Sequence, residues 1–444
     1  MKVQASRIDL SSSQWKTALG SAIWVLVVCF SVESVGEDRG WLDIRNFGAT
    51  PSDNTDDALS IQKAIDEARR RGVGVFVPKG TFLIGSTLLL PSHVRIRGCG
   101  DLSVIKLCDG ANTNMFENAD PERGNEGIEI TRLKLDGNRG KQDLGRVLEI
   151  NYFVIRTKRA FRCRFQDLTI VNAPGDGIAN WGGQYNLYSR ITVVSAYRYG
   201  IQLQGAKGFG PVRANTVQQC AAYDCGWDGI TLGHASDNEI IECNAYRNGH
   251  AGIAGDRANG VRVASCLVYE NKFYGIAVAD AALRTPPHGW IVQSNRVFRN
   301  REGGIGVLNG AYDVAVLDNS IANNDGEGIR IGQDCHAVLV RGNRISRNGR
   351  DGIRVLGAMA VQITNNICWN NGRSRRGAGI ACLGSPRKPV RMVVITGNIC
   401  FDNQRVPTQQ QGIRAIKDEQ IIIQNNVCPT PAHAGAPSPE RASH

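Results

Sequence analysis

Apolar and polar positions along most of this chain repeat at a regular interval. From residue 177 onward a Gly-Ile pair occurs ten times, and five of the nine intervals between successive pairs are 23 or 24 residues. The isoleucines stand at positions 178, 201, 230, 253, 276, 305, 329, 353, 380 and 413. A basal interval that is lengthened only by insertions is typical of a solenoid, in which each repeat forms one coil that stacks on the next.

Other positions repeat in phase with the isoleucines. Ten residues before them stand Cys220, Cys243, Cys266, Asn295, Asn319 and Asn343, and five before them Cys225, Asn248, Asn271, Asn300, Asn324 and Asn348. Short apolar alternations such as 338–340, broken by turns such as Asn348-Gly349, predict strands joined by tight turns. Stacked Asn side chains can hydrogen-bond between coils, while aliphatic columns fill the interior. The pattern predicts an all-β, right-handed, single-stranded parallel β-helix in which every Gly-Ile isoleucine is buried.

The chain has 13 cysteines and no Cys-x-x-Cys pair. Those that fall in the repeating columns are expected to be buried small hydrophobes, because a chain of this length can bury a core without disulfides. A disulfide between Cys220 and Cys225 is an alternative. The Cys and His spacings match no metal-ligand motif, so no metal site is predicted.

The N-terminus carries a targeting signal. Lys2, Arg7 and Lys16 precede an apolar run at 22–32, which is too short for the roughly 20 residues of a membrane-spanning helix. We expect a signal peptide over residues 1–36, no stable membrane span, and export to the periplasm, the cell surface or the medium; a mistaken start codon and an uncleaved anchor are the alternatives. Residues 429–444, rich in Pro, Ala and Ser, are expected to be a disordered tail.

A separate module precedes the repeats. Residues 43–49 predict a strand, 53–57 an acidic turn and 60–70 an amphipathic helix with Thr55 or Asp56 as its N-cap. This stretch, about 41–100, resembles the N-terminal module of the pectate lyase superfamily, which includes polygalacturonase-like and rhamnogalacturonase-like enzymes, phage tailspikes and alginate epimerases. It differs in having 51–54 (Pro-Ser-Asp-Asn) where the family usually has Gly-Asp-Gly. The resemblance implies that the helix caps the open end of a β-helix that spans residues 41–428.

The chain is basic, with a formal net charge of +11 and a pI of about 9.1. The basic residues are scattered and no nucleic-acid motif occurs, so no nucleic-acid partner is expected. Arg330, Arg354 and Arg414 each follow a Gly-Ile pair directly. They would form an outward column, which suits a polymer that carries carboxylates or sulfates. The alternative is a positive face that serves solubility.

Acidic residues occur two positions before some of the isoleucines. Asp176 and Asp228 stand there, with Tyr199 in the coil between them. In polygalacturonase-like glycosidases an Asp at this position belongs to the catalytic motif, but the paired Asp-Asp of that family is replaced here by Tyr199. Two coils separate the two Asp residues by about 9–10 Å, near the upper end of the carboxylate spacing of inverting glycosidases. The alternative is that each Asp is a turn residue.

Aromatic and imidazole side chains surround this column in the sequence. Trp181, Tyr197 and Trp227 are candidates for stacking on a sugar ring. His234 and His250 flank the Asp228 strand and are candidate proton carriers. We expect Asp176, Tyr199, Asp228, His234 and His250 to face one groove as catalytic residues, with the three aromatic residues, Arg330 and Arg354 binding substrate.

These patterns favour an exported enzyme that cleaves or epimerises an acidic polysaccharide. In hydrolysis Asp176 and Asp228 would divide the acid and base roles; in elimination Tyr199 or a His would carry the proton beside an Arg or a metal. No cofactor is certain, and calcium is a possible one. The alternative is a non-catalytic β-helix that binds carbohydrate or serves as a periplasmic scaffold. The sequence carries no signal for an oligomeric state.

Overall fold

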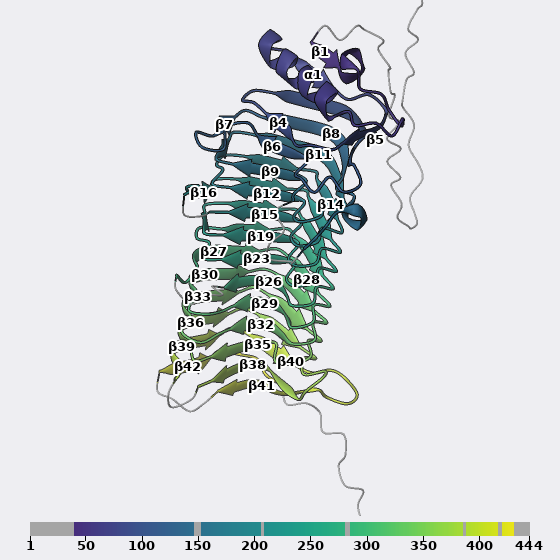
Figure 1. Cartoon of the computed structure of the whole chain (residues 1–444). Coiled ribbons are helices and arrows are strands. Elements are labelled where there is room, and N and C mark those ends of the chain that lie inside the picture. The colour runs from purple at the N-terminus through teal and green to yellow at the C-terminus, as the bar shows by residue number, and fades with distance from the viewer. Residues whose placement is uncertain are drawn as a thin grey trace, which may run out of the picture. The chain divides into compact units, whose positions relative to one another are not determined.

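The computed structural model describes residues 40–145, 152–205, 208–279, 285–384, 388–415 and 420–429. Within them the chain winds as successive parallel strands into the predicted right-handed β-helix (Figure 1). The expected signal peptide and all but the first residue of the expected tail lie outside the described residues. No helix of the described part is long and apolar enough to cross a bilayer.

A 13-stranded sheet collects one strand from each coil, and we call it the Gly-Ile sheet because ten of its strands carry a Gly-Ile isoleucine. Its strands are β4 (Leu88–Leu90), β6 (Phe116–Asn118), β9 (Ile155–Lys158), β12 (Ile178–Trp181), β15 (Ile201–Gln204), β19 (Ile230–Gly233), β23 (Ile253–Asp256), β26 (Tyr274–Ala279), β29 (Gly303–Val307), β32 (Glu327–Ile331), β35 (Ile353–Leu356), β38 (Gly377–Leu383) and β41 (Gln409–Ala415).

A 25-stranded sheet forms the rest of the wall. Its strands are β1 (Trp41–Asp43), β2 (Gly74–Phe76), β3 (Gly80–Ile84), β5 (Arg95–Leu107), β8 (Glu129–Asp136), β11 (Arg164–Val171), β13 (Leu187–Ser189), β14 (Thr192–Val194), β17 (Thr216–Gln218), β18 (Ala221–Tyr223), β21 (Glu239–Ile241), β22 (Asn244–Tyr246), β24 (Arg262–Ala264), β25 (Leu267–Tyr269), β27 (His288–Gln293), β28 (Arg296–Phe298), β30 (Tyr312–Leu317), β31 (Ser320–Ala322), β33 (His336–Arg341), β34 (Arg344–Ser346), β36 (Met359–Thr364), β37 (Ile367–Trp369), β39 (Arg391–Thr396), β40 (Ile399–Phe401) and β42 (Ile421–Gln424). Two short pairs complete the strands, β7 (Asn125–Glu126) with β10 (Ala160–Phe161) and β16 (Val212–Arg213) with β20 (Ala235–Ser236).

The isoleucines align in register from coil to coil, and they form the interior column that the sequence predicts. Ile178 pairs with Ile201, Ile201 with Ile230, and the series continues to Ile413. Nine of the ten are buried, as predicted. Ile413 is only half-buried because it belongs to the last coil of the described sheet, which has no further coil to cover it.

Two ladders of Asn side chains connect the turns, as the sequence pattern predicts. The backbone N–H of Asn300 donates to Oδ1 of Asn324 over 2.9 Å, and that of Asn324 donates to Oδ1 of Asn348 over 3.1 Å. In the other ladder the Asn295 N–H donates to Asn319 Oδ1 over 2.9 Å. Cys266 extends this second ladder with a thiol, since its Sγ accepts the backbone N–H of Cys243 in the preceding coil. Each rung satisfies buried backbone donors that no strand partner reaches.

The twelve cysteines among the described residues are free thiols, and nine of them are buried. The alternative disulfide between Cys220 and Cys225 is therefore not formed. Both thiols are buried and each contacts a backbone carbonyl, which is the behaviour of small core residues.

Helix α1 (Ala58–Arg71) lies at the N-terminal end of the β-helix and confirms the predicted helix at 60–70 (Figure 1). Its buried face, which includes Ile61, Ala64 and Ile65, packs over β1, β2 and β4. The expected N-cap is wrong by one residue, because Asp57 occupies that position. Asp56 still accepts the Ala58 N–H over 2.9 Å, so its carboxylate satisfies a free donor of the first turn. Two 3₁₀ turns, at Ile44–Phe47 and Arg139–Lys141, complete the helical elements described.

Candidate functional site

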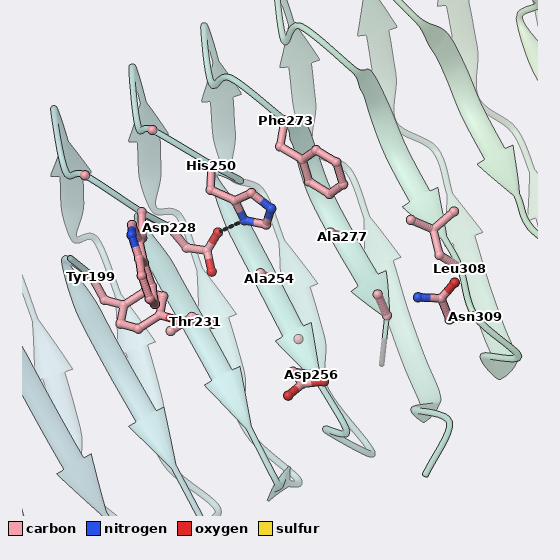
Figure 2. Close-up of a pocket in the computed structure, with 15 residues that line it drawn as sticks. Tyr199, Asp228, Thr231, His250, Ala254, Asp256, Phe273, Ala277, Leu308 and Asn309 are labelled. Atoms are coloured by element: carbon pink, nitrogen blue, oxygen red, sulfur yellow. Dashed lines mark hydrogen bonds and ion pairs between the residues drawn. The ribbon is translucent and has the colours of Figure 1, made fainter. Parts of the chain in front are cut away.

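A cleft of about 680 Å³ opens on the outer face of the Gly-Ile sheet, over β15 to β29. Figure 2 shows its side chains rising from neighbouring parallel strands and from the turns that precede them. The lining residues are Tyr199, Gly226, Trp227, Asp228, Thr231, Gly249, His250, Ala254, Gly255, Asp256, Phe273, Ala277, Ala279, Leu308 and Asn309.

The hollow exists because consecutive coils place small residues in one outward column. Thr231 pairs with Ala254, Ala254 with Ala277, and Ala277 with Gly306. Larger side chains stand at both ends of this floor, with Trp227 at one end and Leu308 at the other. A run of small residues in one column, with larger side chains at both of its ends, therefore produces a bounded cleft on an otherwise regular surface.

Asp228 and His250 form the central polar contact of the cleft. Oδ1 of Asp228 lies 2.6 Å from Nδ1 of His250 and also accepts the backbone N–H of Ala251 over 2.9 Å. The Asp228 side chain is 8% exposed and the His250 side chain 52% exposed. A carboxylate only accepts, so Nδ1 carries the hydrogen and Nε2, on the far side of the ring, is left to the cleft (Figure 2). The hydrogen bond to Asp228 raises the pKa of His250.

Aromatic rings border this pair on both sides. Tyr199 and Trp227 meet edge to face with ring centroids 5.1 Å apart. Phe273 stacks on the imidazole of His250 at 4.4 Å with an interplanar angle of 11°. Burial, with a smaller contribution from the Asp228 charge, raises the pKa of Tyr199, so its phenol stays protonated at neutral pH. The cleft therefore combines apolar ring faces with a protonated phenol and an imidazole whose tautomer is fixed.

Asp256 and Asn309 line the cleft at the C-terminal ends of its strands. Asp256 closes strand β23, and its Oδ2 accepts from Arg257 over 2.8 Å. Figure 2 shows Asp256 below the Ala254 floor and away from the Asp228–His250 contact. Of the two acidic residues of the cleft, Asp228 thus lies before its strand and Asp256 at the end of its strand.

Asp176 does not face the cleft, and the expectation that it would is wrong. Its side chain is fully buried and forms a two-bond contact with Arg198, at 2.9 and 3.1 Å. Burial raises the pKa of Asp176 despite this pairing. The neighbouring Arg198 covers the carboxylate. Asp176 therefore cannot act with Asp228 as the acid–base pair on one glycosidic bond.

The remaining predicted residues lie apart from the cleft. His234 is exposed on the turn after β19, with a φ of 45°, and Tyr197 is half-buried before Arg198; neither is a lining residue. Trp181 packs against Phe153 and Phe209, on the coil before that of Tyr199. Of the predicted group, the structure gathers Tyr199, Trp227, Asp228 and His250.

Arg330 and Arg354 lie on the same outer face but further along the sheet. They continue the column that forms the cleft floor, because Gly306 pairs with Arg330 and Arg330 with Arg354. They are not cleft residues, and Arg354 contacts Glu327 and Asp351, which do not line the cleft.

Sequence reasoning missed several lining residues, among them Thr231, Asp256, Phe273 and Leu308. A signal for Phe273 was present, since it occupies the same position, three before the isoleucine, as Trp227 and His250. Within the described ranges, no three His, Cys, Asp or Glu side chains gather in a way that could hold a metal ion.

The chemistry open to this arrangement is proton transfer. An imidazole fixed by a buried carboxylate can accept a proton at Nε2 and return it, and a protonated phenol nearby can donate one. The ring faces of Trp227 and Phe273 can hold the apolar face of a sugar.

Comparison with known sequences gives two family matches. The family model described as "Right handed beta helix region" matches residues 153–321 and 290–428, which together cover more than half of the chain. The model "Rhamnogalacturonase A/epimerase, pectate lyase-like" matches residues 41–137.

Two curated relatives match parts of the chain. The preneck appendage protein of Bacillus phage PZA is 27% identical over 202 residues, which are 44% of this chain and 21% of that protein. Alginate lyase 7 of Azotobacter vinelandii is 34% identical over 108 residues, which are 22% of this chain and 12% of that protein. The chain thus spans about a fifth or less of the length of these relatives.

Solved structures share the fold at low sequence identity. The A-module of mannuronan C-5 epimerase AlgE6 from Azotobacter vinelandii has a TM-score of 0.54 at 18% identity, over 87% of this chain and 98% of that one. The surface adhesin PfbA of Streptococcus pneumoniae has a TM-score of 0.63 at 15%, over 78% and 92%. The catalytic unit of a GH87 α-1,3-glucanase from Streptomyces thermodiastaticus has a TM-score of 0.62 at 16%, over 87% and 70%.

Proposed function

The chain belongs to the right-handed β-helix family, with the pectate-lyase-like N-terminal module that its sequence predicted, and on this premise we propose that it is an exported enzyme acting on a polysaccharide. The observation that carries the proposal is the contact between Asp228 and His250 in a cleft walled by aromatic rings. A buried carboxylate that fixes an exposed imidazole is costly to place on a surface that serves only as scaffold. Similarity to an alginate lyase and to an epimerase module adds support.

His250 is the proposed proton carrier. Asp228 fixes the tautomer with hydrogen on Nδ1, so Nε2 accepts a proton from the sugar, and the carboxylate stabilises the imidazolium that forms. Asp228 acts through His250 and is a positioning residue. Tyr199, which is protonated and lies on the coil next to that of Asp228, two coils from His250, is the proposed donor to the departing or re-protonated atom.

Elimination or epimerisation fits this set of groups better than hydrolysis by two carboxylates. Inverting and retaining glycosidases need two carboxyl groups that face one bond. The predicted partner Asp176 is buried against Arg198, which leaves Asp228 without it. In elimination His250 takes the proton from the ring carbon that carries the carboxylate. The electron pair left behind forms a double bond in the ring, the bond between the sugar carbon and the glycosidic oxygen breaks, and that oxygen leaves with a proton from Tyr199. In epimerisation the proton is returned from the opposite face.

The test is a substrate screen with matched variants. Purified protein is incubated with alginate, polygalacturonate, a glycosaminoglycan and α-1,3-glucan, and three products are measured: ultraviolet-absorbing unsaturated uronates, new reducing ends, and the uronate ratio by proton NMR. We expect unsaturated products or an altered uronate ratio from one uronate polymer, and loss of that signal in His250→Gln but not in His234→Gln. Activity that survives in His250→Gln would overturn the proposal.

A second candidate is a non-catalytic carbohydrate-binding β-helix. The similarity to a surface adhesin and to phage appendage proteins favours it, as do the regular coils at β30 to β36, which hold no cleft residue. Binding to a polymer of the screen, with no product in any of the three assays, would select this candidate.

A further inference from the structure

Four arginines and two carboxylates lie beyond the C-terminal end of the cleft, on strands of the Gly-Ile sheet and in the turn before β35. This arginine cluster consists of Arg330, Arg350, Arg354 and Arg414 with Glu327 and Asp351. It is continuous with the cleft, because one outward column runs through Ala277, Gly306, Arg330, Arg354, Ala381 and Arg414. A chain-like ligand that lay along the cleft floor would reach the arginines without leaving this face.

The carboxylates of the cluster are buried beneath the guanidinium groups. The Glu327 side chain is 1% exposed, and its Oε1 lies 3.3 Å from Arg354 and 3.6 Å from Arg350. The Asp351 side chain is 3% exposed and lies 3.4 Å from Arg414. Four positive and two negative groups leave a surplus of positive charge, which the fold holds in place.

The pairs within the cluster are also incomplete. Their distances of 3.3–3.7 Å exceed the roughly 2.7–2.9 Å of a charge-assisted hydrogen bond. Glu327 Oε2 and the Nε atoms of Arg330, Arg354 and Arg414 are buried and have no hydrogen-bond partner. A complete salt-bridge network would give these atoms hydrogen-bond partners. A ligand-binding site without its ligand leaves such atoms unpaired.

Cations also stand on the N-terminal side of the cleft. Arg156 and Lys158 on β9 align through β12 and β15 with the strand that carries Thr231. Arg156 pairs with Glu117, whereas Lys158 lies over the Trp181 ring at 5.7 Å. The cleft therefore sits between two positively charged stretches of one sheet face.

We propose that the arginine cluster binds carboxylates of the same polysaccharide chain that occupies the cleft, so that the substrate is a polyuronate read several sugars away from the reacting bond. This inference rests on the proposed function and adds its substrate class. Coils are about 4.8 Å apart, which puts Arg330, three coils further along the sheet, about 14 Å beyond the coil of His250. That separation corresponds to a few sugar units of an extended chain. Planar guanidinium groups suit carboxylates because they donate two parallel hydrogen bonds.

The experiment measures binding, which does not depend on turnover. The probes are a size-fractionated alginate oligosaccharide and the same oligosaccharide after reduction of its carboxyl groups, each titrated calorimetrically at several salt concentrations. The variants are Arg330→Gln with Arg354→Gln, and Arg344→Gln as a control on β34, outside the Gly-Ile sheet. Thermal midpoints are recorded for all variants, and Arg414→Gln replaces the double variant if the latter does not fold.

We expect the wild-type protein to bind the alginate probe and to bind the reduced probe at least tenfold more weakly. The double variant should lose about tenfold to a hundredfold in affinity for alginate and show a shallower salt dependence, with Arg344→Gln unchanged. Because this binding is measured without turnover, failure of the catalytic proposal leaves the result intact. Equal affinity for the two probes, or unchanged affinity in the double variant, would overturn the inference.

Discussion

Removing one rung of the Asn ladder tests how the β-helix is held together. Asn324 is buried, and its Oδ1 accepts from the backbone N–H and from Nδ2 of Asn300, each over 2.9 Å. Its Nδ2 donates to Asn348 Oδ1 over 2.9 Å and to the Val297 carbonyl over 3.3 Å. The substitution Asn324→Ala removes all four hydrogen bonds.

The cost follows from which groups lose their only partner. Asn300 Nδ2 keeps two carbonyl acceptors and Asn348 Oδ1 keeps the backbone N–H of residue 324, but the Asn300 N–H loses the side-chain acceptor that it has. An orphaned buried donor costs about 1–3 kcal/mol and each remaining lost bond about 0.5–1 kcal/mol. We expect the local free energy of opening to fall by about 4 kcal/mol.

Native-state hydrogen exchange at the Asn300 amide is the assay. A fall of about 4 kcal/mol corresponds to exchange that is faster by two to three orders of magnitude, at roughly 1.4 kcal/mol per factor of ten. Ser320→Ala, at an exposed position of the same coil, is the control and should leave exchange within a few-fold of wild type. If Asn324→Ala exchanged no faster than Ser320→Ala, the ladder would not stabilise the coils.

Three further outcomes follow from the site. Asp176→Asn leaves Arg198, whose side chain is 12% exposed, without its carboxylate partner. This substitution should lower the free energy of unfolding, measured by chemical denaturation, by about 3–5 kcal/mol. The folded variant should keep wild-type turnover. Tyr199→Phe keeps the ring that meets Trp227 and removes the phenol, so kcat should fall by about a hundredfold with KM within about threefold; an unchanged kcat would exclude Tyr199 as proton donor. Because the pKa of His250 is raised in the folded state, its charged form stabilises the fold. This contribution is complete below the unfolded pKa of about 6.5 and is lost as the pH rises through the folded pKa. The thermal midpoint of wild type should therefore exceed that of His250→Gln most at acid pH, and a difference that grew with pH would contradict this sign.

The repeat is the part of the fold that the sequence predicts best. The Gly-Ile isoleucines, and the Asn or Cys residues of the ladders, recur at the same positions from coil to coil, so a local pattern reports a long-range pairing. The N-cap of α1 was less predictable, because Thr55, Asp56 and Asp57 all suit that position and the tertiary contact of Asp57 with the Thr50 N–H decides among them.

The candidate site was only partly predictable, since a column position does not report what covers a side chain. Asp176 and Asp228 are equivalent in the repeat, yet the residue three before the next isoleucine is Arg198 in one case and His250 in the other. The arginine buries the first carboxylate in an ion pair, and the imidazole connects the second to the cleft. The cleft itself arises from the run of Ala and Gly residues at 254, 277 and 306, which looks unremarkable in the sequence.

The pH–rate profile of wild type and Asp228→Asn, on a polysaccharide that gives turnover, tests the central claim most directly. With Asp228 in place, activity should require neutral His250, and should fall as the pH drops through an inflection above the ordinary histidine value of about 6.5. Asp228→Asn keeps an acceptor for the Ala251 N–H but removes the charge. Turnover should therefore fall by about two orders of magnitude or more and the inflection should move to lower pH, with a thermal midpoint close to that of wild type. Full activity with an unmoved inflection would show that the Asp228–His250 pair does not carry the reaction.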